Sequence, residues 1–186
     1  RMNPHGRTLT TDEAKTHLDG VVGLIAGTEK LTGDLLRGLP GLKAISRVGV
    51  GMDGVDQVAA KELGIAVSNT PSAHVDAVAE LTLAGLMAIL RQVPASDASI
   101  RAGGFDKPMG RLLRGKTLGF VGFGQVARAL ATLIAPFDCK LLAYDVVQDA
   151  AAATALGATY ATLDRVVADA DIVSIHVPYS KAAHNL

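Results

Sequence analysis

The sequence has little of three things that point to particular classes of protein. It has one cysteine, Cys139, which excludes an intrachain disulfide and suits a reducing compartment. Its 18 basic and 18 acidic side chains cancel, so no overall charge attracts nucleic acid or an anionic membrane. Its longest apolar run, Leu81 to Leu90, is too short to cross a bilayer. We therefore expect a cytoplasmic protein whose partners are small molecules or other proteins.

The remaining composition is that of an ordinary globular chain. Of its 186 residues, 49% are hydrophobic and 19% are charged, which is enough for one large domain or two small ones. No pair of cysteines or histidines has the spacing of a metal site. The chain begins with Arg1 instead of a methionine, so we expect it to be a segment of a longer protein.

The most informative stretch runs from Lys116 to Ala127. An apolar run ends in the turn Gly122-Phe-Gly124, a segment compatible with a helix follows, and a second apolar run is closed by Asp145. This layout is typical of a dinucleotide-binding βαβ unit, in which glycines let a pyrophosphate approach the backbone and the acid binds a ribose hydroxyl. The competing interpretation is a βαβ turn with a purely structural role.

Short apolar runs alternate with helix-compatible segments along most of the chain. The pattern predicts strands at 19–27, 42–48, 65–69, 116–121, 140–145 and 171–177. Such alternation favours parallel pairing in an open α/β sheet, with ligands at the carboxyl ends of the strands.

A long helix is predicted from Val75 to Arg91. Apolar residues cover most of its circumference, so we expect it to pack against its own domain and against a partner. Glu80 on this helix is expected to be a buried carboxylate with an internal hydrogen bond. Further along the chain, Gly103-Gly104 is a candidate hinge.

Several motifs occur in the order found in D-isomer-specific 2-hydroxyacid dehydrogenases, which the sequence resembles. The nearest branch looks like the phosphoglycerate dehydrogenases. The motifs are Gly49-Val-Gly-Met-Asp-Gly-Val-Asp56, Gly64-Ile-Ala-Val-Ser-Asn-Thr-Pro71, Val78-Ala-Glu-Leu81, Arg91, the glycine turn, and Asp171-Ile-Val-Ser-Ile-His-Val-Pro178.

The resemblance implies an α/β architecture in which a partial flavodoxin-like substrate domain joins the first half of a Rossmann NAD-binding domain. We assign residues 1–92 to the substrate domain, including the long helix, and residues 93–186 to the NAD-binding domain. The resemblance also implies NAD as cofactor, a small 2-hydroxy or 2-oxo acid as substrate, and a homodimer formed through the Val75 to Arg91 helix.

Site residues follow from the resemblance position by position. Gly122, Gly124, Gln125 and Val126 are assigned to the pyrophosphate, and Asp145 to the adenosine ribose. Val177 and Pro178 are assigned to the wall beside the adenine or ribose, and Gly49, Val50 and Gly51 to the substrate carboxylate. The Gly49 loop has an alternative interpretation, a turn whose glycines serve backbone freedom alone. Apolar residues follow Asp145 and no arginine is there to receive a 2′-phosphate, which favours NAD over NADP.

Two departures from the family pattern affect function. Gly27-Thr28 stands where phosphoglycerate dehydrogenases carry an arginine and a serine for the substrate phosphate. The family's catalytic arginine, glutamate and histidine have no counterparts in this chain, so we assign no catalytic residue and expect no turnover. His176 is interpreted mainly as a hydrogen-bonded structural residue.

Two other interpretations remain open. One is an NAD-sensing co-regulator or interaction module of the same fold, in which cofactor binding drives association without turnover. The other is a flavodoxin-like fragment that binds nothing tightly. Measuring NAD binding separates the second interpretation from the rest.

Overall fold

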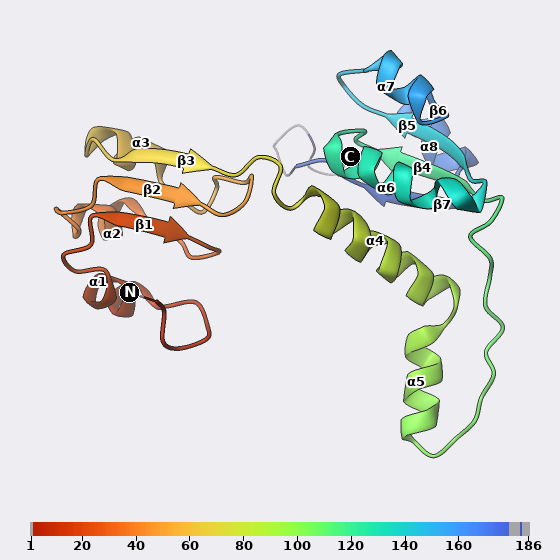
Figure 1. Ribbon diagram of the computed structural model, residues 1–186, viewed down its shortest axis with the longest axis horizontal. Coiled ribbons are helices and arrows are strands. Elements are labelled where there is room, and N and C mark those ends of the chain that lie inside the picture. Colours follow the sequence, from red (N-terminus) through yellow and green to blue (C-terminus); the bar gives the residue numbers. More distant parts are fainter. Residues whose placement is uncertain (1, 179–182, 184–186) are drawn as a thin grey trace. The chain divides into compact units, whose positions relative to one another are not determined.

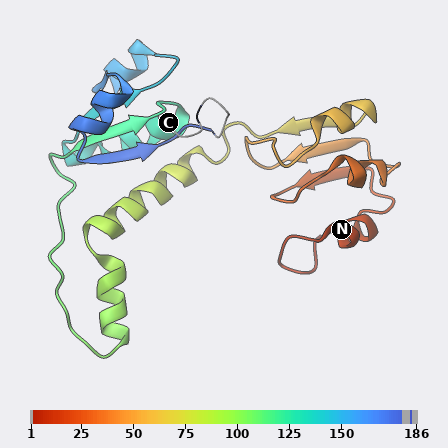
Figure 2. The same ribbon diagram turned by 180° about the vertical axis from the view of Figure 1, so that it is seen from behind.

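The computed structural model describes residues 2–178 and Ala183. The chain divides into two compact units, the first ending at His74 and the second beginning at Val75. Figures 1 and 2 show that each unit has a sheet of its own. This division differs from the boundary at residue 92 expected from the sequence, because the long helix packs within the second unit. The earlier boundary concerns domains of the longer protein and stays a prediction.

The first unit contains a three-stranded parallel sheet in the order β1-β2-β3. Its elements are α1 (Thr11–His17), β1 (Gly23–Ala26), α2 (Gly33–Arg37), β2 (Ala44–Arg47), α3 (Gln57–Glu62) and β3 (Ala66–Asn69). The predicted strands and their parallel pairing are confirmed. Leu35, Leu36 and Ile45 are almost fully buried in the core of this unit.

Side-chain caps fix where the helices of the first unit begin. Thr32 accepts a hydrogen bond from the Leu35 N–H, and Asp56 accepts one from the Ala59 N–H. Each cap satisfies a backbone donor that the helix itself leaves without a partner. Helix α1, which the sequence did not lead us to expect, begins with a reciprocal capping box between Thr10 and Glu13.

The second unit contains a four-stranded parallel sheet in the order β6-β5-β4-β7. Its elements are α4 (Val75–Leu90), α5 (Val93–Arg101), β4 (Thr117–Val121), α6 (Gln125–Ile134), the 3-10 turn η1 (Ala135–Phe137), β5 (Lys140–Tyr144), α7 (Ala150–Ala155), β6 (Ala158–Tyr160), α8 (Leu163–Asp169) and β7 (Ile172–Ile175). The predicted α/β class with parallel sheets is confirmed.

The central strand β4 is buried on both faces. Leu118 and Phe120 belong to the core cluster that also contains residues of α6. Gly119 points to the other face, where a Cβ would lie 2.7 Å from a methyl carbon of Val166 on α8. A side chain at position 119 would therefore force α8 away from the sheet, and this fixes the depth of the helix layer.

Helix α4 packs against α6 and has a second apolar face in solvent. Ala79 is fully buried and Leu83, Leu86 and Leu90 pack on the core, whereas Leu81 is 72% exposed. Glu80 is also exposed, so the expectation of a buried carboxylate was wrong. Water solvates its charge, and it has no hydrogen-bond or ion-pair partner among the residues that the structure describes.

Within the described part of the chain, no single helix is long and apolar enough to span a membrane. The pair α4 and α5 meets the length and composition requirement together, but it is bent by 64° at the break between the helices.

Candidate functional site

Three loops meet at the carboxyl edge of the second unit's sheet. Strands β4, β5 and β7 run parallel, and Val121 is in register with Tyr144 on one side and Ile175 on the other. The glycine turn follows β4, Asp145 follows β5, and His176 to Pro178 follow β7. This is the edge at which open parallel sheets bind their ligands.

The conformation of Gly122 requires glycine for two independent reasons. Its φ is +89°, a region that side chains rarely adopt. A Cβ built on it would lie 2.9 Å from the backbone carbonyl carbon and oxygen of His176 and from a methyl of Val177. The turn after β4 thus packs directly on the loop after β7.

Neither of these reasons applies to Gly124. Its φ of −78° suits any residue, and a Cβ there would have no atom within 4 Å. It is the N-cap of α6 and, having no side chain, makes no side-chain hydrogen bond to the first turn of that helix. The open space over Gly124 and the uncapped helix start together suit an anion that approaches the backbone. Gln125 is exposed and Val126 is half-buried in the first turn of α6.

Asp145 joins the glycine turn to the end of β5. Its Oδ2 accepts the Phe123 N–H at 2.7 Å, and its Oδ1 accepts the Val147 N–H at 3.1 Å. The side chain is only partly buried, and a carboxylate has about four acceptor positions, so room remains for ribose hydroxyls.

A network around Arg128 was missed from the sequence. Arg128 Nε donates to the Phe123 carbonyl oxygen, and its Nη1 lies 2.9 Å from Asp149 Oδ2. Asp149 also caps α7, and its N–H donates to the Tyr160 hydroxyl. The Ala152 N–H, and after it the Arg128 guanidinium, hold the pKa of the Asp149 carboxyl below its ordinary value.

One sequence signal pointed to part of this network. Asp149 stands directly before an alanine-rich helix, which is a typical N-cap position. Its pairing with Arg128 joins residues 21 positions apart, so no local pattern reveals it.

The loop after β7 lies beside the glycine turn that follows β4. The His176 N–H donates to Val121 O at 2.7 Å, and the ring bonds to the Ser174 hydroxyl at 2.8 Å. Burial lowers the pKa of the His176 ring. Val177 is half-buried against Gly122, and Pro178 is exposed. These contacts agree with a structural role for His176.

In the Gly49 loop of the first unit, one backbone N–H already donates a hydrogen bond within the protein. The Gly49 N–H donates to the Thr70 hydroxyl at 2.6 Å, and the Asn69 side chain donates to Val50 O. Within residues 2–178, the N–H groups of Val50 and Gly51 have no hydrogen-bond acceptor. Gly49 has a φ of +134°, and a Cβ there would collide with the Arg47 guanidinium.

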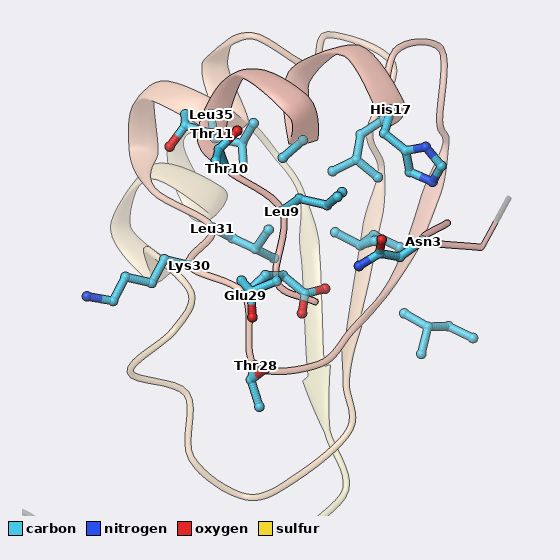
Figure 3. Close-up of a pocket in the computed structure, with 15 residues that line it drawn as sticks. Asn3, Leu9, Thr10, Thr11, His17, Thr28, Glu29, Lys30, Leu31 and Leu35 are labelled. Carbon is cyan, nitrogen blue, oxygen red and sulfur yellow. The ribbon is translucent and has the colours of Figure 1, made fainter. Parts of the chain in front are cut away.

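A cavity of about 520 Å³ lies elsewhere in the first unit, between the N-terminal segment, α1 and the loop after β1. Figure 3 shows the Glu29 side chain among the lining groups and Lys30 extending away from them. Glu29 accepts the Gly27 N–H at 2.9 Å. None of the residues assigned to the site from the sequence lines this cavity, although Thr28 does.

The comparisons with known proteins agree with this arrangement. Residues 83–186, more than half of the chain, match the model of the D-isomer specific 2-hydroxyacid dehydrogenase NAD binding domain. The chain belongs to the D-isomer specific 2-hydroxyacid dehydrogenase family. It contains the family's NAD-binding region, and NAD is the cofactor of that region.

Among relatives, a glyoxylate reductase of Thermococcus litoralis is 34% identical over 183 residues, which cover 94% of this chain and 55% of the relative. A D-3-phosphoglycerate dehydrogenase of Mycobacterium tuberculosis is 38% identical over 157 residues, 83% of this chain and 30% of the relative. The crystal structure of D-lactate dehydrogenase from Aquifex aeolicus complexed with NAD and lactic acid superposes with a TM-score of 0.76 at 30% identity, over 90% of this chain and 51% of that one. The chain thus spans about half of these relatives or less.

Proposed function

We propose that the intact protein is an NAD-dependent oxidoreductase that interconverts D-2-hydroxy acids and 2-oxo acids. The observation that carries the proposal is the hydrogen bond between Phe123 N–H and Asp145 Oδ2, which joins the glycine turn to the acid of the next strand. That geometry suits a dinucleotide with its pyrophosphate at the turn and its adenosine ribose at the acid. NAD supplies the hydride chemistry, and the protein contributes position and electrostatics.

Each group of the cofactor is proposed to bind particular residues of the second unit. The pyrophosphate lies over Gly124 at the uncapped start of α6, where Gln125 and Val126 form the first turn. The ribose hydroxyls donate to Asp145. The loop of Val177 and Pro178, beside Gly122, forms the wall next to the adenosine.

The substrate carboxylate is proposed to bind the loop of Gly49, Val50 and Gly51. Because the Gly49 amide is engaged by Thr70, the amides of Val50 and Gly51 are the donors for the carboxylate. Gly49 then shapes the loop through its positive φ instead of binding the substrate directly.

We place the protein on the phosphoglycerate dehydrogenase-like branch on the basis of motif order. The loop after β1 argues against a phosphorylated substrate, because Gly27-Thr28 replaces the arginine and serine of phosphoglycerate dehydrogenases and Glu29, which accepts the Gly27 N–H, adds a negative charge to the same loop. Initial rates of the intact protein with glyoxylate, hydroxypyruvate and 3-phosphohydroxypyruvate decide the substrate. A preference for 3-phosphohydroxypyruvate supports the branch assignment. No activity with 3-phosphohydroxypyruvate would contradict that assignment.

The 186-residue chain is proposed to bind NAD without turnover, because the family's catalytic arginine, glutamate and histidine have no counterparts in it. The assay is NADH oxidation by this chain with a 2-oxo acid. Oxidation at a rate that Gly124→Asp abolishes would contradict the proposal.

We also propose that residues 1–92 belong to the substrate domain and that the helix from Val75 to Arg91 forms a homodimer interface. Leu81 and Ile89 are 72% and 70% exposed on the face of α4 that does not contact α6, which supports an interface there. A cytoplasmic location stays a prediction.

The same exposed face favours a second candidate, an NAD-sensing interaction module. That function predicts association that strengthens with NAD and no dehydrogenase activity in the intact protein. Turnover of any 2-oxo acid by the intact protein decides in favour of the enzyme.

A further inference from the structure

Arg128 has a fixed position beside the glycine turn. Its Nε donates to Phe123 O at 2.9 Å, and its guanidinium carbon lies 5.8 Å from the centre of the Phe123 ring. The rest of the guanidinium faces Asp149, at 2.9 Å. The side chains of Arg128 and Asp149 are 33% and 45% exposed, so other anions in solution can reach this position.

The arginine and the ribose-binding acid flank the same residue. The Phe123 N–H donates to Asp145, and the Phe123 carbonyl accepts from Arg128. In dinucleotide-binding folds an acid at this place receives the ribose 2′-hydroxyl, whereas an arginine nearby accommodates the 2′-phosphate of NADP. The sequence around Asp145 offered no such arginine; the fold brings one from α6.

Asp149 keeps this arginine occupied. Its Oδ2 contacts Arg128 Nη1, its Oδ1 accepts the Ala152 N–H, and its own N–H donates to Tyr160 Oη. The carboxylate is therefore held by Arg128 and by the Ala152 N–H, while Tyr160 holds the Asp149 backbone, and the carboxylate occupies one side of the guanidinium that an anion such as a phosphate could otherwise bind.

We propose that Asp149 determines coenzyme specificity: by binding Arg128 it withholds the cation that would otherwise receive the 2′-phosphate of NADP, and so favours NAD. The inference rests on the cofactor site of the proposed function. Asp145 excludes the 2′-phosphate by its own negative charge, and Asp149 acts beside it by neutralising the attracting group.

The test uses ligands that report on the adenosine half of the site alone. Affinities of the 186-residue chain for 5′-ADP and 2′,5′-ADP are measured by calorimetry for wild type, Asp149→Asn, and Asp149→Asn combined with Arg128→Gln. Asparagine keeps the N-cap of α7 and removes the charge. Asp169→Asn, which frees Arg165 on α8 with the same change in net charge, is the matched control.

We expect Asp149→Asn to raise the ratio of 2′,5′-ADP to 5′-ADP affinity about tenfold, the value of one charge-assisted hydrogen bond. The gain should vanish with Arg128→Gln, and Asp169→Asn should leave the ratio at the wild-type value. An unchanged ratio in Asp149→Asn, or a gain that survives loss of Arg128, overturns the inference and leaves the NAD site standing. Failure of wild type to bind 5′-ADP removes the cofactor site and the inference together.

Discussion

The Asp145 carboxylate accepts the backbone N–H of Phe123 at 2.7 Å, so the side chain that follows β5 holds the glycine turn that follows β4. Asp145→Ala removes that acceptor and leaves the amide without a protein partner. We expect hydrogen exchange at the Phe123 amide to accelerate about tenfold, the value of a hydrogen bond to a charged group. The adjacent Gly122 amide, which donates to Tyr144 O at 2.8 Å, is the internal control. Equal acceleration at both amides would mean that the whole turn has loosened.

Gly122→Ala should destabilise the fold strongly. The φ of +89° strains any side chain, and the new Cβ meets the His176 backbone at 2.9 Å. We expect the free energy of unfolding in urea to fall by about 2–4 kcal/mol, since left-handed strain and a backbone collision add together.

Gly124→Ala is the matched control for that experiment. Its φ of −78° and the empty space around its Cβ leave only the weaker N-cap preference of alanine, so we expect the unfolding free energy to fall by about 1 kcal/mol or less. The same methyl group occupies the space over which the pyrophosphate is proposed to lie, so NAD affinity should still fall. A large loss of stability at Gly124, or none at Gly122, would contradict the distinction between the two glycines.

Most of the fold follows from local pattern. Buried parallel strands appear in the sequence as short apolar runs. The side chains of Thr32, Asp56 and Thr162 mark where helices begin, and each accepts the expected backbone hydrogen bond. Strand β6 was missed because Ala158 to Tyr160 has only three residues and a mixed composition. Helix α1 was missed although its capping box is local.

The site was predictable only where its chemistry is local. The glycines and Asp145 carry a recognisable spacing, and the structure places them at one sheet edge. The bonds of Arg128 to Phe123 and Asp149 depend on the fold bringing the start of α6 next to the start of α7, which no periodicity encodes. The prediction that Glu80 is buried was wrong for a similar reason. The sequence of an apolar helix does not reveal which of its faces the rest of the chain covers.

His176 should make stability depend on pH in a defined direction. Burial lowers the pKa of its ring in the folded state below the ordinary value of 6.5, so the unfolded chain binds the proton more readily. Its contribution is intact above pH 6.5 and is lost as the pH falls toward the folded pKa. We expect the midpoint of thermal unfolding to drop less between pH 6.5 and 5 in His176→Gln than in wild type. Parallel pH profiles of the two proteins would contradict this assignment.

The exposed face of α4 should mediate self-association. Leu81→Glu places a charge within this apolar surface, at a residue that is 72% exposed in the single chain. We expect the dimer dissociation constant, measured by sedimentation equilibrium, to rise at least about tenfold, because burying an unpaired carboxylate is costly. Val167→Glu, at an apolar residue on α8 that is 57% exposed, is the control for the added charge. A monomeric wild type, or equal effects of the two substitutions, would remove the proposed interface.

The central claim is that the turn after β4 and the acid after β5 form one NAD site. Calorimetric titration of the 186-residue chain with NAD tests it most directly. We predict saturable binding by wild type and an affinity lower by about tenfold or more in Asp145→Ala, since that variant loses charge-assisted hydrogen bonds to the ribose. Identical titrations without binding in both proteins would contradict the claim.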